Sequence, residues 1–206
     1  MQGAIPMQNT IIIFLGVYFI CFFGFAVIFR NFVASKKAGV NVFQLNQKSG
    51  AESITGWYFK FLPLVSILVF IIYSFLPNLY LSIGPIDLMN HDTIQWIGMG
   101  IMVFSLIWVL AAQSQMGASW RIGIDHEAKT EFVQKGLFKY SRNPIFVGII
   151  FISFGFFLLL PNPITLTILA LDIALIQIQV AMEEEYLTKQ HGDSYIEYCQ
   201  HVRRWL

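Results

Sequence analysis

Charged residues are scarce in this sequence. Asp, Glu, Lys and Arg make up 12% of its 206 residues, whereas 56% are hydrophobic. A water-soluble domain carries about 25% charged residues, so the composition excludes an ordinary soluble domain and indicates lipid as the solvent. Four stretches contain no charged residue, and each is longer than the roughly 20 residues that cross a bilayer as a helix. They are residues 1–29, 61–86, 93–120 and 143–171.

Several other features are absent. The formal net charge is only +1, so no global field attracts a polyanion, and nucleic acid is not expected as a partner. The four histidines have no metal-binding spacing, and we expect no metal. The two cysteines, Cys21 and Cys199, lie far apart in the chain and should be unpaired. The first apolar run follows no basic segment and ends without a small-residue cleavage site, so it should remain as a membrane anchor.

The apolar runs predict an all-α, polytopic integral membrane protein with about five transmembrane helices. We place these helices at about residues 10–29, 61–79, 93–113, 144–160 and 163–182. Only Pro161 and Asn162 separate the last two, which should therefore form a tight C-terminal helical hairpin. Asn143 and Asn162 each precede a proline, the pattern of an N-cap followed by the first helical position. We expect a further helical segment that is broken at Gly192.

The basic residues lie in three segments. All thirteen Lys and Arg residues fall within residues 30–60, 114–142 and 183–206, and none lies in the other connections. The positive-inside rule predicts that these segments are cytoplasmic, with the N-terminus outside and the C-terminus inside. In a bacterium this would be the inner membrane. The single membrane domain, residues 1–206, thus has water-facing mass on one side only.

A polar stripe runs along the last predicted span. Asp172, Gln179 and Glu183 are spaced by seven and four residues, which places them on one helix face over roughly 16 Å. A carboxylate inside the membrane indicates either a functional cavity or a hydrogen bond between helices, and for Asp172 both readings stay open. Glu184 and Glu185 follow Glu183 and point away from the stripe.

Two motifs carry a family resemblance. The run 136–146, Gly-Leu-Phe-Lys-Tyr-Ser-Arg-Asn-Pro-Ile-Phe, resembles the G-x-Y…R-H/N-P-x-Y motif of the isoprenylcysteine carboxyl methyltransferase family. The residues from Glu183-Glu184 to Val202-Arg203 resemble its C-terminal E-E-x-x-L…F-G-x-x-Y-x-x-Y…V-x-R pattern. The resemblance covers about residues 114–206. It makes residues 113–206 the cofactor-binding catalytic region and residues 1–112 the N-terminal transmembrane helices.

The resemblance implies an S-adenosylmethionine-dependent methyltransferase. It would take the cofactor from the cytoplasm and methylate a lipophilic acceptor reached through the membrane lipid. The implied cofactor-binding residues are Thr130, Glu131, Phe132, Val133, Phe138, Arg142, Asn143, Pro144, Phe146 and Glu183. Arg142 suits the cofactor carboxylate and Glu183 its ammonium or ribose. Arg142, Asp172 and Glu183 are the catalytic candidates, and Gln179 and Asp172 are the substrate-binding candidates.

The sequence departs from the eukaryotic members of this family at several positions. Asn143 replaces the histidine of the motif, and Phe138 and Phe146 replace its tyrosines. Gln179 stands where those members carry an arginine associated with the substrate, and a glutamine cannot neutralise a carboxylate. Three alternatives stay open: a phospholipid or small-amine methyltransferase, a sterol-reductase-like enzyme that binds NADPH, and a non-catalytic membrane scaffold. The sequence does not name the methyl acceptor.

Overall fold

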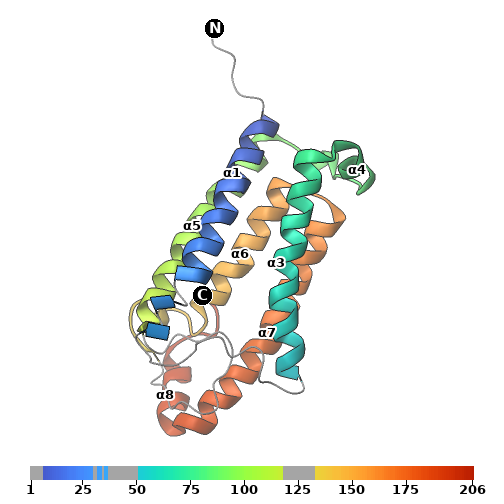
Figure 1. Cartoon of the computed structure of the whole chain (residues 1–206). Helices are drawn as coiled ribbons and strands as arrows, with labels where there is room; N and C mark the ends of the chain where they lie inside the picture. Colours follow the sequence, from blue (N-terminus) through green and yellow to red (C-terminus); the bar gives the residue numbers. More distant parts are fainter. Residues whose placement is uncertain (1–6, 30–31, 34, 37–50, 118–132) are drawn as a thin grey trace.

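The computed structural model describes residues 7–29, 32–33, 35–36, 51–117 and 133–206 (Figure 1). The elements run in the order α1 (Met7–Cys21), the π-helix η1 (Phe22–Phe29), α3 (Ala51–Phe75), α4 (Pro77–Ser82), the 3-10 helix η2 (Asp87–Met89), α5 (Asp92–Met116), the 3-10 turn η4 (Gly136–Lys139), α6 (Pro144–Leu159), α7 (Pro163–His191) and α8 (Asp193–His201). The part of the chain described here contains no strand. The predicted all-α class is confirmed.

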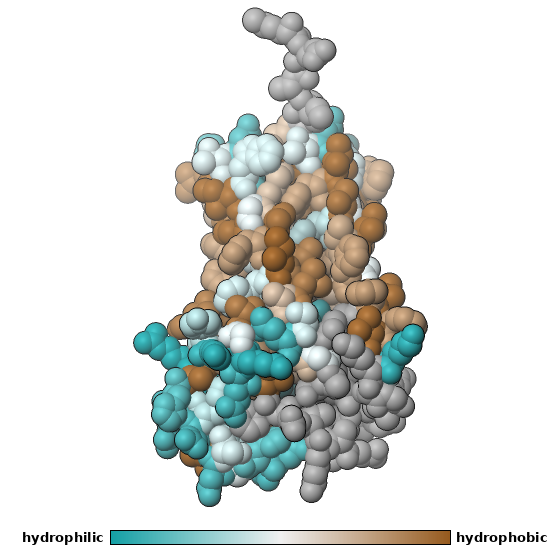
Figure 2. All heavy atoms as spheres, turned by 90° about the vertical axis from the view of Figure 1, so that its left-hand side faces the viewer, coloured by the Kyte–Doolittle hydropathy of each residue, from teal (hydrophilic) through white to brown (hydrophobic). Residues whose placement is uncertain are grey.

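Five apolar helices form the bundle. Four of them in the described residues are long and apolar enough to cross a membrane: Met7–Phe29, Ser53–Phe75, Asp92–Met116 and Pro163–His191. The fifth, α6, is apolar but has 16 residues, a length of about 24 Å. Hydrophobic side chains cover the long helices, and hydrophilic ones gather at the end that holds α8 (Figure 2). The chain is therefore a multi-pass membrane protein.

The ends of two predicted spans were wrong. The second span was placed at 61–79, but α3 begins at Ala51 and ends at Phe75. Leu76 leaves the helical conformation, with φ −131° and ψ 62°, because a residue before proline is hindered from it, and Pro77 starts α4. The last span continues beyond residue 182 to His191, where Gly192 at φ +55° ends the helix as predicted.

The two expected asparagine caps have different outcomes. Asn162 is a cap, because its side chain accepts hydrogen bonds from the backbone N–H groups of Ile164 and Thr165 at 2.9 and 3.1 Å. The prediction for Asn143 was wrong, since its side chain makes no capping bond to α6. Its Nδ2 instead donates to the backbone carbonyl of Arg204 at 3.2 Å. The start of α6 is thus tied to the C-terminal end of the chain.

Glycines allow α5 and α6 to pack closely. A Cβ at Gly155 would lie 2.8 Å from the carbonyl oxygen of Gly98 and 2.7 Å from Cγ of Met102. A Cβ at Gly148 would lie 2.4 Å from Cγ2 of Val109. Small residues let helix backbones approach each other in lipid, where van der Waals contact drives association. No sequence motif had indicated this role.

The apolar core joins the five apolar helices. Leu15 and Tyr18 of α1, Val69 of α3, Met102 of α5, Phe156 of α6 and Ile168 of α7 are all buried in it. The Tyr18 hydroxyl donates to the Met102 carbonyl at 3.3 Å, which satisfies the phenol inside the bilayer. Tyr18, Met102 and Phe156 also line a cavity, so this core forms the cavity floor.

Candidate active site

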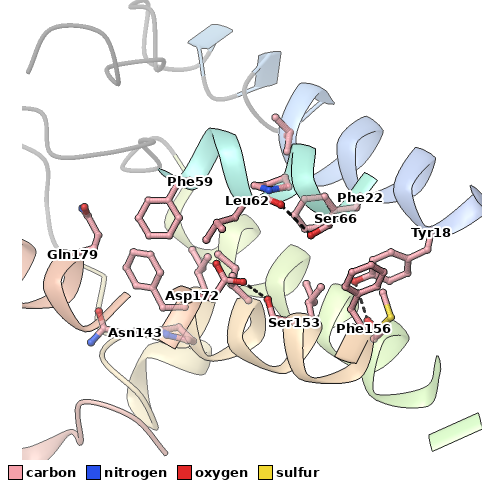
Figure 3. Close-up of a pocket in the computed structure, with 18 of the residues that line it drawn as sticks. Tyr18, Phe22, Phe59, Leu62, Ser66, Asn143, Ser153, Phe156, Asp172 and Gln179 are labelled. Atoms are coloured by element: carbon pink, nitrogen blue, oxygen red, sulfur yellow. Dashed lines mark hydrogen bonds between the residues drawn. The ribbon is translucent and has the colours of Figure 1, made fainter. Parts of the chain in front are cut away.

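A cavity of about 300 Å³ opens into the helix bundle (Figure 3). Side chains from α1, η1, α3, α5, η4, α6 and α7 line it. Most of the wall is apolar, and polar groups lie at several points along it. Arg142, Asn143 and Glu183 lie toward the α8 end of the cavity, which we call the mouth; Asp172 and Ser153 lie further along α7 and α6 and are deeper in the bundle. A predominantly apolar cavity with a few convergent polar groups is typical of a small-molecule site.

Most of the sequence-predicted site residues line this cavity. They are Phe138, Arg142, Asn143, Pro144, Phe146, Asp172, Gln179 and Glu183. Val133 is half-buried and is not one of the lining residues. Thr130, Glu131 and Phe132 lie outside the described residues. The stripe on α7 therefore faces the interior of the bundle, and the cavity connects it to the turn before α6.

The turn that supplies Phe138 is held from two sides. Gly136 begins it at φ +64°, where an added Cβ would meet the side chain of Gln115 at 2.4 Å. Gln115 Oε1, at the end of α5, accepts a hydrogen bond from the backbone N–H of Leu137 at 2.7 Å. The Tyr198 hydroxyl of α8 donates to the Phe138 carbonyl at 2.6 Å. These bonds connect the turn to both α5 and α8.

The first residue of α6 is held by α5. Nε1 of Trp108 donates to the carbonyl oxygen of Pro144 at 2.8 Å. Pro144 lines the cavity, so this bond sets the position of the mouth relative to α5. Sequence reasoning had missed both Trp108 and Gln115, because each lies in an apolar span at least 22 residues from its partner in the chain.

Arg142 is paired with Glu184. Nη2 of Arg142 lies 3.3 Å from Oε1 of Glu184, and both side chains are 14% exposed. Arg204 also binds Glu184, with its Nε 3.2 Å from Oε1 and its Nη2 2.6 Å from Oε2. This hydrogen-bonded carboxylate raises the pKa of the Arg204 guanidinium above its ordinary value. Glu184 does not line the cavity, but it holds a residue that does.

Arg142 retains an unused donor. Its Nε is buried, and no group in the described part of the chain accepts a hydrogen bond from it. A buried guanidinium N–H without a partner is costly and is usually satisfied by a ligand or water. Because Arg142 lines the cavity mouth, this donor suits an anionic group such as a carboxylate.

Asp172 both faces the cavity and hydrogen-bonds a neighbouring helix, the two possibilities that the sequence left open. It is 7% exposed and lines the cavity, and the Ser153 hydroxyl donates a hydrogen bond to its Oδ2. It therefore binds a neighbouring helix and also faces the space in which a ligand would lie. Figure 3 shows Ser153 and Asp172 directed toward each other across the interface of α6 and α7.

Gln179 lies between the mouth and the deeper level. Its Oε1 accepts a hydrogen bond from the hydroxyl of Thr55 on α3 at 3.1 Å, and both residues are buried. The rings of Phe59 on α3 and Phe146 on α6 stack with centroids 6.2 Å apart. Both rings line the cavity, so an aromatic pair from two helices forms part of its wall; Figure 3 labels Phe59.

The chain is similar to known membrane methyltransferases. The sequence model of a family described as phospholipid methyltransferase matches residues 93–194, about half of the chain. The fold is similar to that of the eukaryotic intramembrane Ras methyltransferase ICMT, isoprenylcysteine carboxyl methyltransferase, solved without a monobody. The TM-score is 0.52 at 18% identity, and the match covers 97% of this chain and 85% of the other. No curated protein matches the sequence.

The fold and the matched region together define a methyltransferase embedded in the membrane. The family model and the fold together support the resemblance to ICMT-like methyltransferases that the two motifs had predicted. Families of this type use S-adenosylmethionine. The sterol-reductase-like and scaffold alternatives are not supported, whereas a phospholipid methyltransferase is compatible with the same findings.

Proposed function

We propose that this enzyme binds S-adenosylmethionine at the cavity mouth and methylates a lipophilic acceptor that enters the cavity from the bilayer. One observation supports this proposal above the others. A single cavity joins charged and polar side chains at one end, Arg142, Asn143 and Glu183, to an apolar interior that contains Asp172. A zwitterionic cofactor suits the first part and a lipid-like acceptor the second.

The residues at the mouth fit the groups of the cofactor. The buried, unpartnered Nε of Arg142 suits the cofactor carboxylate, and Glu183 suits the ammonium or a ribose hydroxyl. Phe138 and Phe146 offer aromatic surface to the adenine. The bound cofactor would supply an electrophilic methyl group on a sulfonium. The protein would contribute alignment and exclusion of water, which are the main requirements of an in-line displacement.

The charges of the cavity favour an amine acceptor over a carboxylate. Asp172 is the charged lining residue in the deeper part, and Gln179 already accepts a hydrogen bond from Thr55. A carboxylate acceptor would bring a second negative charge close to Asp172 in a low dielectric. An amine head group is an ammonium at neutral pH and must lose a proton before its nitrogen can attack the methyl group; the Asp172 carboxylate can accept that proton, and S-adenosylhomocysteine then leaves as the methyl group is transferred.

The two comparisons point to different acceptors. The matching family model is described as phospholipid methyltransferase, and the similar structure is named for isoprenylcysteine. The prenylcysteine carboxylate is the second candidate, favoured by the overall likeness of the fold. The amine head group of a phospholipid is the first, because the position of Asp172 and the presence of Gln179 suit it better.

The orientation of the chain follows from its charges. The mouth residues Arg142 and Asn143 bind the backbone just after α8, and all three basic segments of the sequence belong to the side that the positive-inside rule makes cytoplasmic. We therefore place the cofactor entrance in the cytoplasm and the acceptor entrance within the bilayer. The N-terminus would lie outside.

Calorimetric titration of the purified protein in lipid nanodiscs tests the cofactor site. We expect the unchanged protein to bind S-adenosylmethionine and not NADPH, and we expect Glu183→Ala to lower the affinity about tenfold or more. The matched control is Glu185→Ala on the same helix, since Glu185 is exposed and pairs with Lys189. Equal affinity in Glu183→Ala and the unchanged protein would contradict the assignment of Glu183.

Transfer of a radiolabelled methyl group tests the acceptor. Nanodiscs containing phosphatidylethanolamine should give a labelled lipid and S-adenosylhomocysteine, and a prenylated cysteine with a free carboxylate should give little product. The reverse pattern would establish the second candidate. Binding of the cofactor without transfer to either acceptor would contradict both acceptor assignments and leave the cofactor site standing.

A further inference from the structure

The last residues of the chain bind residues 141–143, the turn between η4 and α6 at the cavity mouth. We refer to residues 202–206 as the C-terminal strap. The backbone carbonyl of Arg203 accepts a hydrogen bond from the N–H of Arg142 at 2.9 Å. The carbonyl of Arg204 accepts from Nδ2 of Asn143 at 3.2 Å and from the hydroxyl of Ser141 at 3.4 Å. The strap therefore contacts three consecutive residues of the turn, two of which line the cavity.

The side chain of Arg204 adds an ionic connection to the same turn. It binds both carboxylate oxygens of Glu184, whereas Arg142 contacts only Oε1 of Glu184 at 3.3 Å. Arg204 is the more exposed partner, with a side chain 43% exposed against 14% for Arg142 and for Glu184. Arg204 thus lies on the outer side of the ion pair and Arg142 on the cavity side.

The three charges determine how strongly Arg142 attracts an anion. With Arg204 in place, one carboxylate is shared by two guanidinium groups, and the cluster keeps a net charge of +1. Arg142 also keeps its unpartnered Nε. Without Arg204, the charge of Glu184 would balance that of Arg142 alone. Both oxygens of the Glu184 carboxylate could then accept hydrogen bonds from the Arg142 guanidinium. Both changes would weaken the attraction of Arg142 for a ligand carboxylate.

We infer that Arg204 is a positioning residue for the cofactor: by occupying Glu184 it leaves the cluster of Arg142, Glu184 and Arg204 with a net positive charge and Arg142 oriented to bind the carboxylate of S-adenosylmethionine. This inference rests on the proposed function. It assigns to the C-terminal end of the chain a part in cofactor affinity, although the Arg204 side chain does not line the cavity.

A pair of ligands separates this role from a general effect on folding. Decarboxylated S-adenosylmethionine keeps the adenosine, the sulfonium and the ammonium but lacks the carboxylate. Arg204→Gln should lower the affinity for S-adenosylmethionine about fivefold, the scale of one partly exposed ion pair. It should change the affinity for the decarboxylated ligand less than twofold. Calorimetry on the full-length protein in nanodiscs measures both affinities without any acceptor.

Two further variants complete the design. Arg203→Gln is the matched control, because Arg203 is exposed and contributes its backbone carbonyl to the turn; it should leave both affinities unchanged. Arg204→Lys keeps the charge but loses the paired hydrogen bonds, so the affinity for S-adenosylmethionine should fall by about half. This variant also serves if Arg204→Gln does not yield folded protein.

Each other outcome is informative. An equal loss of affinity for both ligands in Arg204→Gln or Arg204→Lys would overturn the inference. Arg204 would then support the structure of the site without acting on the recognition of the cofactor carboxylate. Unchanged affinity for both ligands would overturn it as well. Failure of the unchanged protein to bind S-adenosylmethionine would instead contradict the proposed function. The unchanged protein therefore serves to distinguish the two failures.

Discussion

Ser153 on α6 donates its hydroxyl hydrogen to Oδ2 of Asp172 on α7, at a point where both side chains line the cavity. The bond engages one of the two carboxylate oxygens and fixes the rotamer of Asp172 toward the cavity. A carboxylate inside a membrane protein is costly and is retained where it serves a partner or a function. Here it has a partner and also faces the space proposed for the acceptor.

Asp172→Asn should separate binding from chemistry. The amide is nearly isosteric with the carboxylate but cannot take a proton, so the rate of amine methylation should fall by about 10²- to 10⁴-fold. The affinity for S-adenosylmethionine should change less than twofold, because the mouth is untouched. Release of S-adenosylhomocysteine and calorimetry measure the two quantities.

Ser153→Ala is the control for Asp172→Asn. It removes the hydrogen-bond donor but leaves the carboxylate in place, and the rate should fall about tenfold or less. Equal rates in Asp172→Asn and the unchanged protein would show that Asp172 serves only the packing of α6 against α7.

Gly155→Ala should destabilise the bundle. The new methyl group would meet the Gly98 carbonyl at 2.8 Å and Met102 Cγ at 2.7 Å, and forcing α5 and α6 apart costs about 1–3 kcal/mol. Gly100→Ala, on α5, has no atom within 4 Å of the new Cβ and should be neutral or slightly stabilising. Thermal unfolding midpoints in one detergent compare the two variants. A higher midpoint for Gly155→Ala would contradict the close packing.

Tyr198→Phe should change how stability depends on alkaline pH. Burial raises the pKa of the Tyr198 phenol to about 12, whereas an unfolded tyrosine ionises near 10. Its contribution to stability is therefore complete below pH 10 and is lost as the pH rises from about 10 through 12. Without the hydroxyl this part of the decline should disappear, and the lost bond to the Phe138 carbonyl should cost about 1 kcal/mol at neutral pH.

Unfolding midpoints between pH 7 and 11.5 check the prediction for Tyr198. The neighbouring Tyr195, whose pKa burial also raises, is present in both proteins, so the difference between the two curves isolates Tyr198. Parallel curves would show that the Tyr198 hydroxyl contributes nothing to the alkaline transition.

Reporter fusions in a bacterial host should establish the orientation. A green fluorescent protein fused after Leu206 should fluoresce, and alkaline phosphatase at the same position should be inactive, because the positive-inside rule places this end in the cytoplasm. Phosphatase inserted between α4 and α5, at Gly84, should be active. Activity of the C-terminal phosphatase fusion would invert the assignment of the cavity mouth to the cytoplasm.

The site was predicted in part from the sequence. The spacing of Asp172, Gln179 and Glu183 placed them on one helix face, and all three line the cavity. Two motifs added the turn before α6. Trp108, Gln115 and Thr55 were missed, because each lies in an apolar or helical segment and belongs to no local pattern. They matter only through partners on other helices.

The sequence by itself determined that the chain lies in a membrane, that it is helical, and which residues share a face of each helix. Long apolar runs and helical periodicity are local properties, and they decide these points. Only the tertiary structure decided which faces meet. The rotation of each helix about its axis depends on close packing, here at Gly98 and Gly155, and that packing brings Ser153 to Asp172. It also decided that Asn143 and Arg142 bind the C-terminal strap, because the two segments lie about 60 residues apart in the chain and meet only when α7 and α8 return to the mouth.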